Sequence, residues 1–328
     1  MNILFCSVGR RGELLKDFRL SMEPGSKIVA ADNSRFAPAL YFADKTYLVP
    51  LINDPGYVDL LLDICKKEKI DAVTTLIDPE IRILAENRGR FAGIGVEVLA
   101  PYTKTADLCF DKYEMYKYCV REGVRTVRTW GSLDDALAAV KAGELSYPLF
   151  VKPRTGSGSV GARKVISEAE LRAAFLEDPG LIAQELMTGE GAFDLDADCY
   201  IDTVSKKSVA IFTKRKISTT LGGANKTISF KDQKLFDFLS EALTHFEFNG
   251  PIDVDVFYKN GEYYLSEVNP RFGGAYLHAY GAGVDFIRLI EKNVRGEANE
   301  SIIGQYEEDV VMLMYDSVVI KKLSEMPE

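Results

Sequence analysis

One stretch constrains the fold more than any other part of the chain: residues 251–274, with the sequence PIDVDVFYKNGEYYLSEVNPRFGG. Apolar and polar residues alternate on both sides of Asn260-Gly261, and this pattern around an Asn-Gly pair is a strong signal for a β-hairpin. We therefore predict two antiparallel strands, at 252–259 and 262–269. Side chains alternate across a strand, so the hairpin limits which of its polar residues can meet.

The hairpin carries four polar side chains near its open end: Asp253, Asp255, Glu267 and Asn269. A two-residue Asn-Gly turn pairs residue 255 with 266 and sends the two aspartates to the face opposite the other pair. A three-residue turn, with Gly261 in a left-handed bulge position, pairs 253 with 267 and gathers all four on one face. We predict the three-residue turn, because carboxylate and amide oxygens on one face suit a hard cation such as Mg²⁺.

The residues that follow the second strand are suited to an anion. Pro270 lacks an N–H group and ends the strand pairing. Arg271 presents a planar fork of donors to a phosphate or a carboxylate, and Gly273 and Gly274 allow backbone amides to approach an anion closely. A solvated hairpin with ordinary surface charges is the alternative, which the specific string E-x-N-P-R-x-G-G disfavours.

Composition and charge exclude several classes of protein. A chain of 328 residues that is 47% hydrophobic and 27% charged is an ordinary soluble globular protein of two or three domains. Its net charge of −9 argues against a general nucleic-acid partner. Five scattered cysteines without a C-x-x-C pair indicate a reducing compartment, with no zinc ribbon and no disulfide framework. No signal peptide and no apolar run near ~18 residues is found, so we expect a cytoplasmic protein without a membrane partner.

The first third of the chain has the pattern of a parallel α/β sheet. Short apolar runs alternate with stretches of helical spacing, and the runs lie at 2–8, 27–33, 46–50, 71–77 and 96–100. The loop after the first run is G-x-x-G and not G-x-G-x-x-G, which disfavours a dinucleotide site. Ligands bind at the carboxyl ends of such strands, so the substrate-site candidates here are Arg10, Arg11, Asp32 and Asp78. Helix caps or salt bridges are the alternative roles, and Asp78 is expected to cap the following helix.

A second informative stretch is YPLFVKPRTGSGSVG at 147–161. Lys152 lies in an apolar strand, and the loop behind it is rich in glycine and hydroxyl groups, including Ser157 and Gly158. Such a loop can close over phosphates as a lid. It is not a Walker loop, because the lysine precedes the glycines. A flexible linker is the alternative, which the lysine on the preceding strand disfavours.

The string Glu267-Val-Asn-Pro-Arg-Phe-Gly-Gly274, with Asp255 twelve residues earlier, resembles the metal-binding signature of the ATP-grasp superfamily. The likeness is greatest to single-unit proteins similar to the carbamoyl-phosphate synthase large subunit. It implies a Rossmann-like parallel α/β domain at 1–103, followed by an ATP-grasp domain at 104–328. That second domain would consist of two α+β subdomains, a small lid at about 125–187 and a larger metal-binding part at about 188–328. Only one grasp unit fits, so we do not expect a complete carbamoyl-phosphate synthase.

The resemblance also implies the roles of individual residues. Asp255, Glu267 and Asn269 would hold Mg²⁺, with two ions expected and Mn²⁺ as an alternative, and Arg271 would contact the transferred phosphate. Asp253 does not have the spacing of a metal ligand and is expected only in an outer contact. Further residues are implied in ATP binding: Lys112 and Lys152 at phosphates, Gln184, Glu185, Leu186 and Met187 at adenine, Glu190 or Asp194 at the ribose, and Lys214, with Arg215 as its alternative, at phosphates.

Arg271, Lys214 and Arg215 are thus the predicted catalytic residues. The predicted substrate contacts are Arg10, Asp78, Gly273, Gly274 and His278, of which His278 would assist proton transfer. We expect an ATP-dependent ligase that joins a small carboxylate to an amine through an acyl phosphate. The alternatives are a carboxylate kinase, a carboxylase-type component, or a nucleotide-binding protein without turnover. A homodimer is also consistent with the resemblance.

Overall fold

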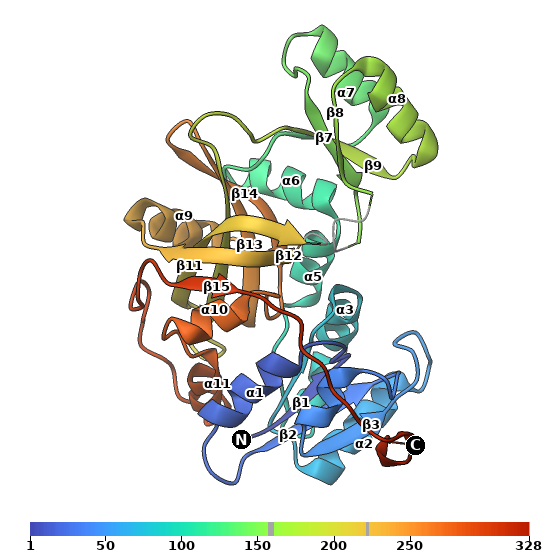
Figure 1. Ribbon diagram of the computed structural model, residues 1–328, viewed down its shortest axis with the longest axis vertical. Coiled ribbons are helices and arrows are strands. Elements are labelled where there is room, and N and C mark those ends of the chain that lie inside the picture. Colours follow the sequence, from blue (N-terminus) through green and yellow to red (C-terminus); the bar gives the residue numbers. More distant parts are fainter. Residues whose placement is uncertain (157–160, 221–222, 328) are drawn as a thin grey trace.

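Three sheets follow one another along the long axis of the molecule (Figure 1). This computed structural model describes residues 1–156, 161–220 and 223–327. No helix among these residues combines the length and the apolar character needed to cross a bilayer. The predicted combination of a parallel α/β sheet with a later α+β part is confirmed.

The first sheet is parallel and has the order β3-β2-β1-β4-β5. Its strands are β1 (Asn2–Cys6), β2 (Lys27–Asp32), β3 (Lys45–Leu48), β4 (Ala72–Thr75) and β5 (Glu97–Val98). Its helical segments are α1 (Gly12–Ser21), η1 (Pro38–Phe42), α2 (Tyr57–Glu68), α3 (Asp78–Glu86) and α4 (Arg88–Ala92). Alternate residues of β1 enter two different cores: Ile3 and Phe5 pack with α1, whereas Leu4 and Cys6 pack with α2 and α3. This two-sided burial explains why the strands are continuous apolar runs.

The second sheet is antiparallel, with the order β14-β13-β10-β11-β12-β15. Its strands are β10 (Phe193–Ile201), β11 (Ser208–Thr220), β12 (Gly223–Phe230), β13 (Gly250–Lys259), β14 (Glu262–Asn269) and β15 (Val311–Leu313). The helical segments after β12 are α9 (Gln233–Leu243), α10 (Tyr276–Gly281), α11 (Phe286–Val294) and η2 (Leu323–Glu325). One apolar core contains residues of α1, this sheet, α10 and α11. The parallel domain is therefore packed against the second sheet.

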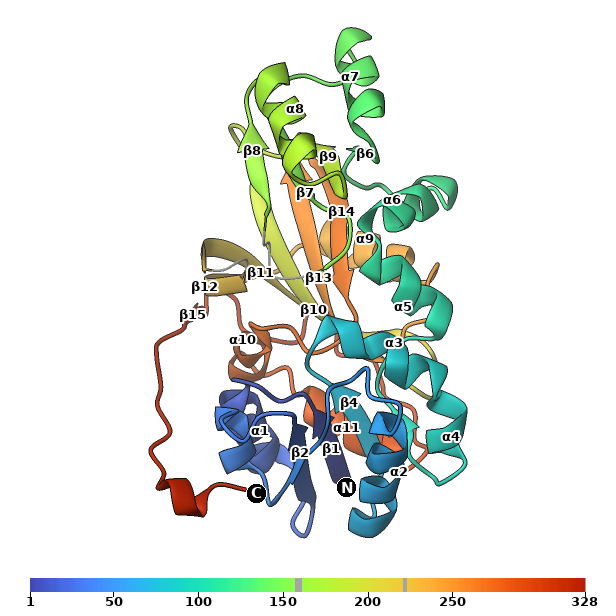
Figure 2. The same ribbon diagram turned by 90° about the vertical axis from the view of Figure 1, so that its right-hand side faces the viewer.

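The third sheet has the order β6-β9-β7-β8 and lies at the far end of the molecule, at the top of Figure 2. Its strands are β6 (Thr129–Trp130), β7 (Leu149–Pro153), β8 (Arg163–Val165) and β9 (Leu181–Glu185), and its helices are α7 (Leu133–Lys141) and α8 (Glu168–Glu177). These elements share a small core of their own. Two helices, α5 (Thr103–Phe110) and α6 (Lys112–Arg121), connect the first sheet to this third one (Figure 2).

The central hairpin forms, but with a different turn from the one predicted. Asn260 and Gly261 both have positive φ values, 54° and 80°, and Lys259 pairs with Glu262, so the turn has two residues. The predicted three-residue turn is therefore wrong. A bulge farther along β14 inserts Ser266 as an extra residue, so that Asp255 pairs with Glu267. The short turn alone would place the aspartates and the pair Glu267 and Asn269 on opposite faces. The extra residue shifts the register by one and brings all four to the same face.

One other local prediction is corrected. Asp78 does not cap α3, because it is the first residue of the helix and the cap position is Ile77. Its carboxylate faces Arg271 instead. The last strand, β15, is short and pairs with β12 over three residues. The chain beyond β15 runs back along the outside toward the first sheet (Figures 1 and 2).

Candidate functional site

One face of the second sheet carries two rows of polar side chains. Residues directly opposite each other in antiparallel strands share a face. The strand registers therefore align a first row of Glu267, Asp255, Asp196 and Lys214 across four strands. The second row consists of Asn269, Asp253 and Asp198. All four polar residues of the hairpin lie on this face, as predicted, although the bulge and not the turn brings them there.

The two outer carboxylates of this face each contact one lysine. Lys152, on β7 of the third sheet, forms an ion pair with Oε1 of Glu267. Lys216, on β11, forms an ion pair with Oδ1 of Asp255 and lies 2.9 Å from Asp194. Burial would raise the pKa of Glu267, but the charges of Lys152 and Lys112 outweigh it, so the pKa lies below its usual value. Burial keeps the pKa of Asp255 raised, although Lys216 opposes this.

A third lysine lies deeper on the same face. Lys214 is wholly buried and forms ion pairs with Asp198 and, at 3.1 Å, with Asp196. Burial raises the pKa of both aspartates, and Lys214 opposes the rise in each. Lys214 was the predicted phosphate contact, yet the structure brings Lys216 to the hairpin carboxylates. Strand alternation already placed both lysines on one face, but it could not show which of them is accessible.

Arg271 is held between acids from two domains. Its Nε lies 3.1 Å from Asp78, at the start of α3, and one terminal nitrogen lies 3.0 Å from Asp253 on β13. Arg11 approaches the same turn and donates to the carbonyl oxygen of Gly273 at 2.6 Å. Burial and the nearby positive charge of Arg271 lower the pKa of Arg11 to about 10. The parallel domain thus contributes Asp78 and Arg11 to the region beyond the hairpin.

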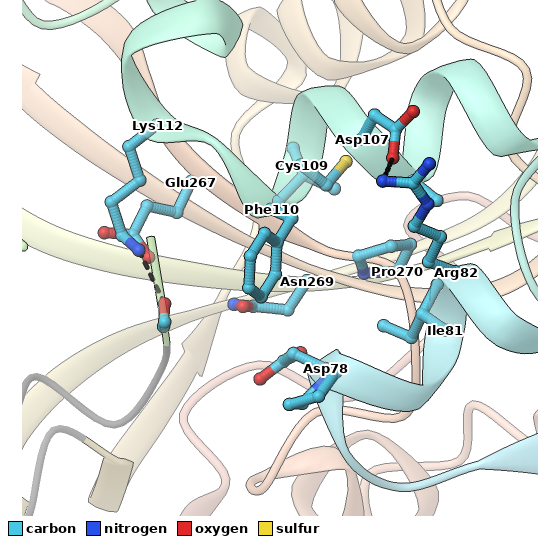
Figure 3. Close-up of a pocket in the computed structure, with 14 residues that line it drawn as sticks. Asp78, Ile81, Arg82, Asp107, Cys109, Phe110, Lys112, Glu267, Asn269 and Pro270 are labelled. Carbon is cyan, nitrogen blue, oxygen red and sulfur yellow. Dashed lines mark hydrogen bonds and ion pairs between the residues drawn. The ribbon is translucent and has the colours of Figure 1, made fainter. Parts of the chain in front are cut away.

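A cavity of about 160 Å³ lies where α3, α5, α6 and β14 meet (Figure 3). Asp78, Lys112, Glu267 and Asn269 line it, as do Arg82, Asp107, Cys109, Phe110 and Pro270. Arg82 and Asp107 form an ion pair at 3.2 Å on the α3–α5 side. No sequence pattern pointed to Arg82 on α3 or to the α5 residues, because they come from ordinary amphipathic helices. The predicted metal ligands Glu267 and Asn269 share this cavity with the predicted substrate contact Asp78.

Lys112 approaches the site from the start of α6. Asp111 caps this helix by accepting from the amides of Tyr113 and Glu114, each at 3.1 Å, which fixes Lys112 in the first turn. The Lys112 ammonium donates to the carbonyl oxygen of Gly156 at 2.7 Å (Figure 3). Burial lowers its pKa. Ser157 and Gly158, the predicted lid residues, lie outside the described residues.

The predicted adenine segment begins in the last two residues of β9 and lies beside the hairpin tip. Lys259 lies 3.0 Å from the Glu185 carboxylate and 3.4 Å from the carbonyl oxygen of Leu186. Arg128 forms a second ion pair with Glu185 at 2.9 Å. Gln184 is buried and donates to the hydroxyl of Thr129 at 2.8 Å, and Met187 is buried as well. The segment therefore has a fixed position relative to β13.

The two ribose candidates differ in their surroundings. Asp194 is part of β10 and contacts Lys216, close to the hairpin carboxylates. Glu190 is exposed and lies in the connection before that strand. The position of Asp194 favours it over Glu190 on geometry, while the ribose contact itself stays a prediction.

Several predicted site residues lie elsewhere. Arg215 points to the opposite face of the second sheet, where it lies over the ring of Phe193 at 5.5 Å. His278 is buried, and its two ring nitrogens contact the hydroxyl of Thr227 at 2.7 Å and the carbonyl oxygen of Val310 at 3.0 Å. Burial lowers the pKa of His278 to about 4. Arg10 is exposed, and its neighbour Arg11 makes the contact with the glycine turn.

Two of the remaining candidates have local structural roles. Asp32 accepts from the amides of Gly9 and Ser34, at 2.8 and 2.9 Å, and so shapes the loop after β1. A Cβ atom added at Gly273 would lie 2.6 Å from Asp253 and 2.8 Å from Asp198, so the turn packs directly on the acidic face. A Cβ atom at Gly274 meets nothing within 4 Å.

Comparison with known families agrees with this architecture. Residues 109–275 match the family described as "ATP-grasp domain", and residues 3–99 match the "PylC-like, N-terminal domain". Pyruvate carboxylase of Staphylococcus aureus is 23% identical over 94% of this chain, which spans 29% of that relative. The carbamoyl phosphate synthase large chain of Campylobacter jejuni is 23% identical over 56% of this chain and 18% of that relative. The chain thus spans less than a third of these two relatives.

Solved structures show the same fold. The N5-carboxyaminoimidazole synthetase of Staphylococcus aureus, complexed with ADP, has a TM-score of 0.72 at 17% identity, covering 92% of this chain and 78% of its own. The L-amino acid ligase of Bacillus licheniformis has a TM-score of 0.67 at 18% identity, covering 91% and 75%. These likenesses extend over the parallel domain and both antiparallel sheets, since they cover more than nine-tenths of this chain. The chain belongs to the ATP-grasp family, whose enzymes use ATP and Mg²⁺.

The hairpin residues fit a magnesium ion by their chemistry. Mg²⁺ takes hard oxygen ligands and retains several waters, so one or two carboxylates are sufficient. Asp255 and Glu267 each contact a lysine through one oxygen, and no described residue hydrogen-bonds Oδ2 of Asp255 or Oε2 of Glu267. Within the described ranges no three His, Cys, Asp or Glu residues converge as a metal cluster. Two carboxylates with an amide oxygen are therefore the donor set to consider.

Proposed function

We propose that this chain is an ATP-dependent ligase that joins a carboxylate to an amine through an acyl phosphate and releases ADP and phosphate. The observation that carries the proposal is the ion pair between Lys152 and Glu267. It brings the strand that feeds the glycine-rich loop directly to the acidic hairpin face. A site for phosphoryl transfer needs this combination of cations and oxygen ligands, because its catalysis consists mainly of positioning and charge neutralisation.

Asp255, Glu267 and Asn269 would hold two Mg²⁺ ions, with Mn²⁺ as an alternative. Ions bound there neutralise charge on phosphate oxygens and bridge them to the protein. The lysines then have a defined role. Lys152 and Lys216 already balance the two carboxylates, and each can turn to an anionic phosphate when a cation takes over its carboxylate. Lys112 adds a third positive charge at the same cavity.

The proposed reaction has two bond exchanges. First, a carboxylate oxygen bonds to the γ-phosphorus of ATP while the bond to the β–γ bridging oxygen breaks, which gives ADP and an acyl phosphate. Second, the amine nitrogen bonds to the acyl carbon and the bond from that carbon to the phosphate oxygen breaks. The nitrogen loses its proton to solvent, and the products are an amide and phosphate. Arg271 would stabilise the negative charge that develops on the transferring group.

The substrates are proposed to enter between the hairpin and the parallel domain. Arg271 is oriented by Asp78 and Asp253 in advance, and Arg11 holds the glycine turn. The cavity of about 160 Å³ beside Asp78 and Asn269 limits the substrates to small molecules. His278 has no part in this reaction, because both of its ring nitrogens are used inside the core. A cytoplasmic homodimer remains our expectation for the whole protein.

The comparisons support a ligase but leave its acceptor undecided. The neighbour from Bacillus licheniformis is an L-amino acid ligase, which favours an amine acceptor. The relative from Staphylococcus aureus is a pyruvate carboxylase, which favours a carboxylase-type component as the second candidate.

A pairwise screen of amino acids and small carboxylates against amines tests this proposal. The assay follows release of ADP and phosphate with Mg²⁺, and we expect release only when an acid and an amine are both present. Release with the acid alone, together with trapping of an acyl phosphate by hydroxylamine, would identify a carboxylate kinase. Dependence on bicarbonate would identify the carboxylase-type reaction. Absence of turnover with every pair would identify a nucleotide-binding protein.

A further inference from the structure

Asp253 contacts Asn269 as well as Arg271, and its role in orienting Arg271 does not explain the contact with Asn269. It lies on β13 directly opposite Asn269 and is only 9% exposed. Its Oδ2 accepts from the Asn269 side-chain amide at 3.3 Å and from Arg271 at 3.0 Å. One carboxylate oxygen therefore contacts both a proposed metal ligand and the proposed phosphate contact.

The asymmetry of the asparagine side chain gives this contact a consequence. The amide end has one oxygen, which can bind a cation, and one NH₂ group, which cannot. A rotation about the last side-chain bond exchanges the two, and a hard cation would then meet a donor instead of an acceptor. A carboxylate that accepts from the NH₂ group favours the rotamer in which the oxygen points away from that carboxylate.

Asp253 is itself held firmly enough to impose this orientation. A Cβ atom at Gly273 would lie 2.6 Å from Oδ1 of Asp253, so the glycine turn packs closely on that oxygen. Oδ2 of Asp253 also accepts from the Arg271 guanidinium at 3.0 Å, and this cation stabilises the ionised carboxylate. An ionised acceptor forms the stronger hydrogen bond.

We propose that Asp253 is a positioning residue that fixes the Asn269 amide with its oxygen toward the metal and aligns Arg271 at the same time. This inference rests on the proposed metal role of Asn269. Asp253 itself does not contact the ion. It acts through its neighbours, as outer carboxylates do when they orient metal-binding side chains. The metal ligand and the phosphate contact are thereby coupled through a single acidic side chain.

The experiment measures Mn²⁺ binding by electron paramagnetic resonance in the presence of a non-hydrolysable ATP analogue. We compare Asp253→Asn with the wild type. We also compare the double variant, which carries Asp253→Asn and Asn269→Asp, with Asn269→Asp alone. Loss of the negative charge in Asp253→Asn frees the Asn269 amide to rotate, and we expect Mn²⁺ affinity to fall about 10- to 100-fold. Turnover at saturating ATP should then require a correspondingly higher Mg²⁺ concentration.

The Asn269→Asp background distinguishes orientation from general damage. A carboxylate at 269 has two equivalent oxygens, so it needs no orienting partner, and Asp253 would only repel it. In this background we expect Asp253→Asn to leave Mn²⁺ affinity unchanged or to improve it. An equal loss of affinity in both backgrounds would overturn the proposed orienting role.

Asp202→Asn is the matched control for folding. Asp202 is also buried and accepts from two asparagine amides, Asn293 at 2.6 Å and Asn299 at 2.8 Å, at the other end of β10. It should lower the melting temperature without changing Mn²⁺ affinity. If the wild type fails to bind Mn²⁺ with the nucleotide analogue, the proposed function itself is wrong. If the wild type binds and Asp253→Asn binds equally well, only the role of Asp253 is wrong.

Discussion

Two groups of lysine–carboxylate pairs lie on the same face of the second sheet and differ mainly in burial. In the inner group, Lys214 is wholly inaccessible and its partners Asp196 and Asp198 are 6% and 1% exposed. In the outer group, Glu267 and Asp255 retain 26% and 29% exposure of their side chains, and lysines contact one oxygen of each. A buried charge cannot leave its partner without a large desolvation cost, whereas a half-exposed carboxylate can exchange a lysine for a cation. The same residue types thus serve as structure in one group and as a candidate site in the other.

The largest expected effect concerns the inner group and is one of stability. Lys214→Met leaves Asp196 and Asp198 buried without their cation, which should cost about 3–5 kcal/mol of unfolding free energy. Chemical denaturation followed by circular dichroism measures the loss. A variant as stable as the wild type would show that the inner carboxylates are protonated and need no partner, and the contrast between the two groups would disappear.

The next effect concerns the outer group and is one of activity. Glu267→Gln removes one of the two proposed metal carboxylates at a half-exposed position. Several kcal/mol of charge stabilisation are lost, so turnover should fall by about 100-fold or more, since ~1.4 kcal/mol corresponds to a factor of ten. Calorimetry should find a melting temperature within a few degrees of the wild type. A large drop in melting temperature together with normal turnover would show that Glu267 has a structural role, like the carboxylates of the inner group.

The pH dependence of stability tests the surroundings of the inner group through His278. This side chain packs against Phe212 on the same buried side, and Lys214 lies near it. Its pKa is lowered to about 4 by burial and by Lys214. The unfolded chain binds the proton near pH 6.5, so the wild type loses unfolding free energy as the pH falls from about 7 to 4. His278→Gln lacks this loss. Its stability deficit relative to the wild type should therefore shrink over that window, by roughly 3 kcal/mol at most, as measured by denaturation at several pH values.

The sequence predicted the order of the sheets and the composition of the hairpin face, because strand periodicity and the E-x-N-P-R-x-G-G string are local signals. It failed where two local rules compete. The Asn-Gly pair favours a two-residue turn, which by itself pairs residue 255 with 266. The acids converge only if residue 255 pairs with 267, and the bulge at Ser266 makes both possible. A bulge depends on the packing of the whole sheet, so a short local sequence pattern does not predict it.

The sequence also did not show how deeply each side chain is buried on the sheet face. Lys214 and Lys216 are equivalent by alternation, but the former is completely buried and the latter reaches Asp255. Arg10 and Arg11 are adjacent in the loop after β1, and only Arg11 reaches the glycine turn. Such differences arise from tertiary packing, which periodicity does not record. In the case of Arg11 the packing joins segments more than 200 residues apart.

Lys216→Met sharpens the contrast between neighbouring lysines. The variant loses the ion pairs with Asp255 and Asp194 near the proposed site. We expect a drop in turnover of about tenfold, corresponding to the ~1.4 kcal/mol that one charged contact contributes. Its stability should decrease much less than that of Lys214→Met, because Asp255 and Asp194 retain access to water. If the two variants unfold at the same denaturant concentration, burial does not separate the two groups.

The smallest effect is expected at Arg215, between the two lysines in sequence and on the opposite face of the strand. Its guanidinium lies over the Phe193 ring at 5.5 Å and has no ion pair with a described residue. An exposed cation–π contact contributes about 0.5–1 kcal/mol, so Arg215→Ala should change stability by that amount and turnover by less than twofold. Steady-state kinetics of Arg215→Ala and Lys216→Met, measured in parallel, give the two turnover numbers to compare. A loss of turnover as large as that of Lys216→Met would mean that both faces of β11 reach the substrates, and the assignment of the site to the face with Lys216 would be wrong.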